Sequence, residues 1–227
     1  MIPIKPISMF DKCFNTPLIQ QLQDAFAMQA DVASLIVDLK GNPYTQPSNF
    51  SQLCDMIRAT SKGGKNCQYS DIEIGKKASY QALHIQPCLS GGLWDAGVGL
   101  YVGDIHIANW LIGQVMNEAQ DLGKMMLYAK SIEADPEQFS YALTQVTVMT
   151  EEQFNHTCEA LHIFSSTISE CTAYEKDLPL SKVETILQNK KAELTSLIQQ
   201  EIELEALLSV WDMFESAAKQ YQLIVPM

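Results

Sequence analysis

A two-residue turn between two strand-like segments constrains the fold of this chain more than any other feature. Residues 88–102 and 105–116 are rich in branched and aromatic side chains, and only Gly103 and Asp104 separate them. Such a short loop joins antiparallel strands and fixes their register. The expected register pairs Val102 with Ile105, Gly99 with Ala108 and Gly97 with Trp110.

This register gives the hairpin two unlike faces. The first face is expected to be apolar, from Trp94 to Val102 on one strand and from Ile105 on the other. The second face has a trough, because glycine and alanine leave the backbone bare there. Two interpretations are open: the trough admits a ligand flanked by Trp110 and Gln114, or a helix packs tightly against it.

Helical and extended segments alternate along the rest of the chain. Apolar residues recur at helical spacing in several stretches, and branched residues interrupted by turn signals predict strands in others. The sequence therefore predicts an α+β fold in which helices cover an antiparallel sheet. The expected elements are a helix at 16–30, a hairpin within 33–50, helices from 51 and from 67, a strand at 83–88, interrupted helices within 121–146 and a helix from 150.

Composition excludes several classes of function. The chain has 15 basic and 27 acidic residues, a net charge of −12, so we expect neither a phosphate backbone nor an anionic membrane as a partner. We see no signal peptide and no run of about 18 apolar residues, which predicts a cytoplasmic protein without a membrane span. Six cysteines in such a chain are expected to be reduced thiols.

Catalytic motifs are missing, and we therefore expect no enzyme. The segment GVGLYVG departs from the dinucleotide fingerprint and lies within a strand, and SKGGKN lacks the spacing of a phosphate loop. The four histidines form no metalloprotease pair, and no nucleophile elbow is present. Each histidine is best explained as a structural residue.

The C-terminal region predicts a separate helical element. Apolar residues from Val183 to Trp211 alternate at spacings of four and three, with Lys190 and Glu201 as interruptions. This pattern is typical of a coiled coil and predicts a homodimer stalk; the alternative is an amphipathic helix lying on its own domain. We therefore divide the chain into an N-terminal segment (1–15), a central domain (16–177) and a helical stalk (178–227).

Five segments in a fixed order resemble a known family. They are LQDAF, SLIVDLKGNPYTQPSNFSQLCDMIR, GGKNCQYSDIEIGKKA, QPCLSGGLWDAGVGLYVGD and LIGQVM. Together they resemble the PocR-type sensory domain of prokaryotic regulators and sensor kinases, from Thr16 to Thr172. The resemblance implies a PAS-like fold that senses a simple hydrocarbon derivative, such as a short alcohol or diol, and passes the signal along a helical dimer to a downstream regulatory protein or output domain.

The resemblance also suggests a binding site between the sheet and its covering helices. The three cysteines of the family pattern would meet at its edge, either as soft lining residues or as thiolates that hold zinc or iron. In the second case Asp71, His84 or a water molecule would supply the fourth ligand. The expected ligand-binding residues are Cys54, Cys67, Asp71, Cys88, Gly97, Trp110 and Gln114.

Overall fold

A computed structural model describes residues 8–117, 120–173 and 180–220. It contains a four-stranded antiparallel sheet with the order β1-β4-β3-β2, which confirms the α+β class. The strands are β1 (Ala33–Val37), β2 (Leu83–Pro87), β3 (Trp94–Val102) and β4 (Ile105–Val115). The helices are α1 (Met9–Cys13), α2 (Thr16–Gln29), α3 (Gln52–Ala59), α4 (Ser61–Gln81), α5 (Leu122–Ser131), α6 (Pro136–Leu143), α7 (Glu151–Ala173), α8 (Leu180–Ile198) and α9 (Leu207–Lys219), with a 3₁₀ turn, η1 (Ile202–Leu204), before the last.

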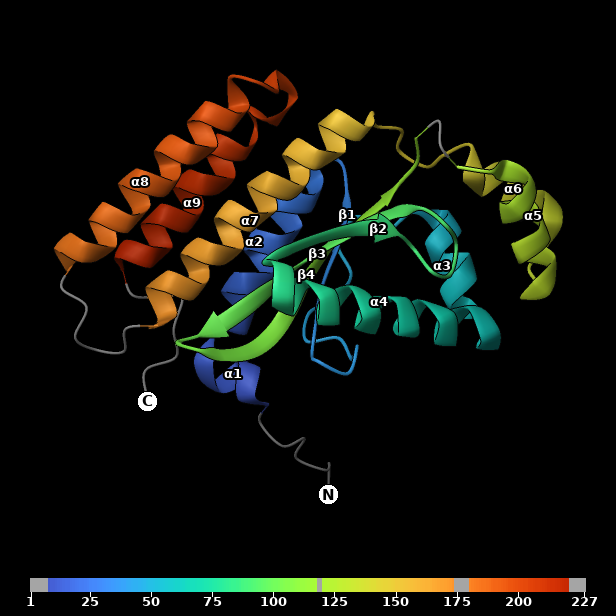
Figure 1. Cartoon of the computed structure of the whole chain (residues 1–227), viewed down its shortest axis with the longest axis horizontal. Coiled ribbons are helices and arrows are strands. Elements are labelled where there is room, and N and C mark those ends of the chain that lie inside the picture. The colour runs from blue at the N-terminus through green and yellow to red at the C-terminus, as the bar shows by residue number, and fades with distance from the viewer. Residues whose placement is uncertain (1–7, 118–119, 174–179, 221–227) are drawn as a thin grey trace.

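Helices cover both faces of the sheet (Figure 1). On one face α2 and α7 pack on the strands, and α8 and α9 form a further layer outside them. The opposite face is covered by α4 and α3, and α5 and α6 lie beyond α3. The functional site described below lies under α3 and α4. Within the described residues no helix combines the length and apolarity needed to cross a bilayer.

The expected hairpin is present, but its register differs from the prediction. Val102 pairs with Ile105 as expected, and a β-bulge between Leu100 and Tyr101 then shifts every later pair. A bulge places two residues of one strand opposite one of the other. The observed partners are therefore Gly99 with Asn109, Gly97 with Leu111 and Val98 with Trp110.

This shift moves Trp110 to the other face of the sheet. Its side chain is fully buried there, edge-on to Phe26 of α2, and its indole nitrogen donates a hydrogen bond of 2.8 Å to Ser34. Trp110 and Gly97 consequently do not share a face, and the expectation that Trp110 flanks the glycine trough is wrong.

Helix α4 begins earlier than the sequence suggests. Thr60 caps it, and the segment SKGGKN forms its first turns instead of a pause before Cys67. Glycine has a low helix propensity, and the two glycines of this segment therefore indicated a break before Cys67. Here it allows a tight corner, because a Cβ atom at Gly63 would overlap the carbonyl oxygen of Ile57 at the end of α3.

The expected long C-terminal helix is broken. Helix α8 ends at Ile198, and after η1 the chain returns as α9, so that α8 and α9 form an antiparallel pair joined by the contact of Lys191 with Asp212 and Glu215. The apolar seam faces the chain's own domain. Six of its residues are buried there: Val183, Leu187, Leu194, Leu197, Leu204 and Trp211. A continuous stalk from Val183 to Trp211 is therefore wrong, and the alternative of an amphipathic element lying on its own domain describes the structure better.

Candidate functional site

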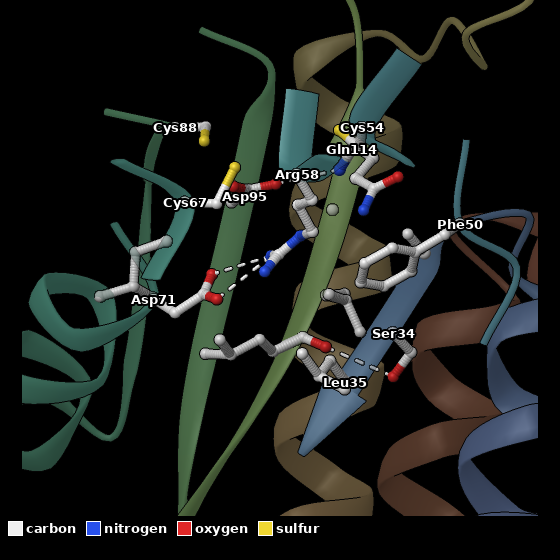
Figure 2. Close-up of a pocket in the computed structure, with 15 residues that line it drawn as sticks. Ser34, Leu35, Phe50, Cys54, Arg58, Cys67, Asp71, Cys88, Asp95 and Gln114 are labelled. Atoms are coloured by element: carbon white, nitrogen blue, oxygen red, sulfur yellow. Dashed lines mark hydrogen bonds and ion pairs between the residues drawn. The ribbon is translucent and has the colours of Figure 1, made fainter. Parts of the chain in front are cut away.

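A small pocket lies between the sheet and helices α3 and α4 (Figure 2). Its volume is about 40 Å³, well below the roughly 150 Å³ of an engineered cavity that holds benzene. The conformation described here therefore has room for only a few heavy atoms. The walls come from β1, the segment before α3, α3 itself, α4, and the paired strands β3 and β4.

Three of the six cysteines line this pocket. Cys54 comes from α3, Cys67 from α4, and Cys88 from the segment between β2 and β3. The structure thus brings together the three thiols that the sequence singled out. Cys158 and Cys171 lie instead on the buried side of α7, on the other face of the sheet.

Burial disfavours the thiolate form of all three cysteines. Burial is the main cause that raises the pKa of Cys54, Cys67 and Cys88 above the ordinary thiol value. Cys67 also lies 3.3 Å from the hydroxyl of Ser90. Metal binding requires thiolates, and among the residues that the structure describes no group of three or more His, Cys, Asp or Glu side chains is arranged to hold a metal ion.

An ion pair forms one wall of the pocket. Arg58 of α3 donates from Nη2 to both carboxylate oxygens of Asp71 on α4, at 3.1 and 3.4 Å, and its guanidinium lies over the ring of Phe50. Burial raises the pKa of Asp71, and the guanidinium opposes that rise. The Nε atom of Arg58 is buried and has no hydrogen-bond partner in the described part of the chain. An acceptor supplied by a bound molecule would satisfy it.

A second carboxyl group faces the same space. Asp95 of β3 accepts a hydrogen bond of 3.0 Å from the backbone nitrogen of Gln114 on β4. Burial raises the pKa of Asp95 to about 7, and the hydrogen bond from Gln114 opposes the rise. Protein atoms desolvate this carboxyl group, although the residue is not fully covered because it opens onto the pocket.

Gln114 links the sheet to the start of α3. Its side-chain oxygen accepts hydrogen bonds from the backbone nitrogen and the hydroxyl of Ser51, at 2.8 and 2.9 Å, and Ser51 in turn caps α3 through Cys54. A φ of +61° at Gln114 turns the strand at this point. Gln114 thereby fixes the position of the helix that carries Cys54 and Arg58.

Two expected ligand-binding residues and one candidate metal ligand lie outside the residues that line the pocket. A Cβ atom at Gly97 would lie 2.6 Å from Ile74 and 2.9 Å from Leu111, so helix α4 occupies the trough there. Trp110 is in the core beyond the sheet. His84 of β2 contacts Gln86, and Asp71 engages Arg58.

Sequence reasoning missed Phe50, Arg58 and Asp95 as pocket residues. Asp95 carried a usable signal, since an acidic residue between Trp94 and Ala96 in a buried strand requires a compensating partner. Arg58 had none, because a basic residue in the last turn of a helix is ordinarily solvated.

Two comparisons with known proteins gave matches. The family described as the sensory domain found in PocR matches residues 12–173. The regulatory protein PocR of Salmonella typhimurium is 27% identical over 127 residues, which cover 54% of this chain and 41% of that protein. This chain therefore spans less than half of that relative's length. No solved structure matches. Because the family match extends over most of the chain, from the residue before Cys13 to the end of α7, the protein belongs to the PocR sensory domain family.

Proposed function

We propose that this chain is a sensory module that binds a small, uncharged, hydroxyl-bearing effector in the pocket between β1, β3, β4, α3 and α4. The observation that carries the proposal is the pairing of charges in that pocket. Arg58 and Asp71 neutralise each other at 3.1 Å, and burial raises the pKa of Asp95 to about 7. A sensory family and a regulatory relative support this role over an enzymatic one.

The charges of the pocket disfavour ionic ligands. An anion would approach two carboxyl groups, Asp71 and Asp95, and a cation would approach Arg58. A buried charge without its own partner is costly. A hydroxyl group avoids both penalties, because it donates to Asp95 and accepts from the unpartnered Nε of Arg58. Three neutral thiols and the side chains of Ile74 and Leu111 would contact the carbon atoms of the effector.

Size bounds the affinity. At a ceiling of about 1.5 kcal/mol per heavy atom, a five-atom diol gains at most roughly 7 to 8 kcal/mol. Dissociation constants of about 1 µM or weaker follow from that bound. A short alcohol or diol is therefore the effector class that we propose.

A second part of the proposal concerns the output of the module. The family relative is a regulatory protein longer than this chain, and we propose that the module signals to a downstream regulatory protein or output domain, in a PAS-like arrangement and as a homodimer. The dimer contact would not use the seam of α8 and α9, because those residues are buried in the chain's own core.

Thermal unfolding with a panel of short alcohols, diols and carboxylic acids tests the proposal. At 100 times its dissociation constant a ligand stabilises the folded state by about 2.7 kcal/mol. We expect an uncharged hydroxyl compound to stabilise the wild-type protein. The stabilisation should be weaker in Asp95→Asn, because an NH₂ group there replaces one of the two carboxylate oxygens that can accept the hydroxyl proton. The matched control is Glu73→Gln, a partly buried acidic residue of α4 that lies outside the pocket lining and pairs with the exposed Lys76.

Two results would contradict the proposal. Stabilisation by acids alone would show that the pocket takes anions. Stoichiometric zinc or iron in the purified protein, found by elemental analysis and lost in Cys54→Ser, would favour the alternative in which Cys54, Cys67 and Cys88 form a metal site.

A further inference from the structure

The segment Cys88–Leu93, here called the glycine loop, separates the pocket from a second, larger hollow. This outer groove has a volume of about 420 Å³, within the range of roughly 300 to 1,000 Å³ that is usual for small-molecule sites. Its walls are the glycine loop on one side and the first turns of α5 on the other. They include Ser90, Gly92, Trp94, Met125 and Tyr128.

One chain of hydrogen bonds joins the groove to the pocket. The hydroxyl of Tyr128 on α5 lies 2.5 Å from the hydroxyl of Ser90, and Ser90 lies 3.3 Å from the thiol of Cys67. Cys67 lines the inner pocket, and Ser90 and Tyr128 line the outer groove. Along this chain, the side chain of Ser90 alone lies between Cys67 in the inner pocket and Tyr128 in the outer groove.

The middle of the glycine loop has few apolar anchors. Its ends are closed by backbone hydrogen bonds from Cys88 to Leu93 and from Gly92 to Cys88, at 2.6 and 3.0 Å. Gly92 has a φ of +81°, and nothing lies within 4 Å of the position that its Cβ atom would occupy. Leu93 at the C-terminal end is buried in the core and anchors the loop there, so the movable part is residues 89–92, in which only Leu89 carries a large apolar side chain, 51% exposed. Segments with few buried apolar contacts open at low free-energy cost.

Side-chain hydrogen bonds from two helices hold this loop closed. Ser70 of α4 accepts from the backbone nitrogen of Leu89 at 3.0 Å, and Cys67 of α4 and Tyr128 of α5 both contact Ser90. Asn66 of α4 donates to the hydroxyl of Tyr128 at 3.1 Å and so fixes its position. Tyr128 is the member of this set that comes from outside the helices covering the pocket.

We propose that the glycine loop is the gate of the cysteine pocket, that the outer groove is the access route of the effector, and that the contact between Ser90 and Tyr128 is the latch. The inner pocket of about 40 Å³ holds the polar end of the effector. Any further apolar part of that molecule would extend past the open loop toward Trp94 and Met125. This inference rests on the proposed function and extends it. It says how the effector reaches the inner pocket and which part of the effector that pocket can hold.

The rate at which a thiol reagent modifies Cys67 tests the gate without any effector. In Tyr128→Phe the latch loses its hydroxyl, and we expect Cys67 to react with iodoacetamide roughly two to ten times faster, the range expected for loss of one hydrogen bond. Peptide mass spectrometry separates Cys67 from the other thiols. Cys158, fully buried on the far face of the sheet, is the internal reference and should not change.

Tyr141→Phe is the matched control, because Tyr141 is an exposed tyrosine of α6 that does not line the groove. Tyr128→Leu is the second latch variant and should accelerate the reaction at least as much as Tyr128→Phe, whereas Ser90 is left intact because its hydroxyl lowers the pKa of the Cys67 thiol. Equal rates in wild type and both latch variants, or equal acceleration of Cys158, would overturn the gate. Because the assay contains no effector, that failure would leave the proposed ligand class untouched.

Discussion

The carboxyl group of Asp95 couples the stability of this protein to pH. Its pKa is about 7 in the folded chain against an ordinary value of 3.8, mainly because of burial. The folded state therefore favours the protonated form. This contribution is fully present below pH 3.8 and is lost as the pH rises toward and through 7.

We expect wild type to lose about 1 to 2 kcal/mol more unfolding free energy than Asp95→Asn between pH 5 and pH 8. The full difference in pKa corresponds to about 4 kcal/mol, and the lower figure allows for the solvent that reaches the carboxyl group through the pocket. Urea unfolding at the two pH values measures the change. Parallel stability profiles for the two proteins would show that Asp95 ionises without penalty.

Loss of the Arg58–Asp71 pair should destabilise the protein more than loss of another ion pair on α4. Asp71→Asn leaves the guanidinium of Arg58 partly buried without a counter-charge, and we expect a loss of about 1 to 3 kcal/mol in unfolding free energy. This loss is smaller than that expected for a fully buried ion pair, because the Arg58 side chain is 31% exposed. Denaturant unfolding measures it. Glu73→Gln removes the partner of Lys76, whose side chain is 62% exposed, and should change stability by less than about 0.5 kcal/mol. Equal losses in the two variants would contradict a special role for the Arg58–Asp71 pair.

Single residues of the site were predictable from sequence only where the family pattern marked them. Cys54, Cys67, Cys88, Asp71 and Gln114 all line the pocket. The pocket position of Arg58 depends on how α3 crosses α4, and no local pattern encodes that crossing.

Helix α4 packs against strand β3 at Gly97, and the contact is too close for any side chain larger than hydrogen at that position. A Cβ atom there would lie 2.6 Å from Ile74 of α4. We therefore expect Gly97→Ala to push the helix from the sheet and to cost about 1 to 3 kcal/mol. Gly123→Ala is the control, because it places a methyl group in the first turn of α5 and should be neutral or slightly stabilising. Thermal unfolding compares the two, and unchanged stability in Gly97→Ala would show that the trough is open.

Elements were predictable where a local signal determines them. The turn at Gly103 and Asp104 marked the hairpin correctly, and the helical spacing of apolar residues marked α2. The bulge at Leu100 and Tyr101 was not predictable, because an inserted backbone residue leaves the alternation of side chains almost unchanged. It nevertheless reversed the face assigned to Trp110.

At the scale of the whole molecule, the C-terminal helices belong to the core of the sensory domain. Trp211 and Phe214 of α9 pack against Phe164 of α7, which in turn contacts Phe26 of α2. The apolar spacing from Val183 to Trp211 was correctly recognised as a buried face, but spacing alone does not reveal whether the partner is another chain or the same one. The expected boundary at residue 177 lies among residues 174–179, outside the described residues.

This packing predicts the response to disruption of the C-terminal layer. Leu187 is fully buried, so Leu187→Ala should cost about 2 to 5 kcal/mol without changing the oligomeric state. A fragment ending at Ala173 should lose cooperative unfolding, because Phe164 and the adjoining face of α7 would be exposed to water. Light scattering and thermal unfolding of the full chain, the variant and the fragment measure both effects. If instead the seam joins two copies, Leu187→Ala would convert dimers to monomers, and the fragment would unfold cooperatively as a monomer. That pair of results would return these residues to the stalk that their spacing first suggested.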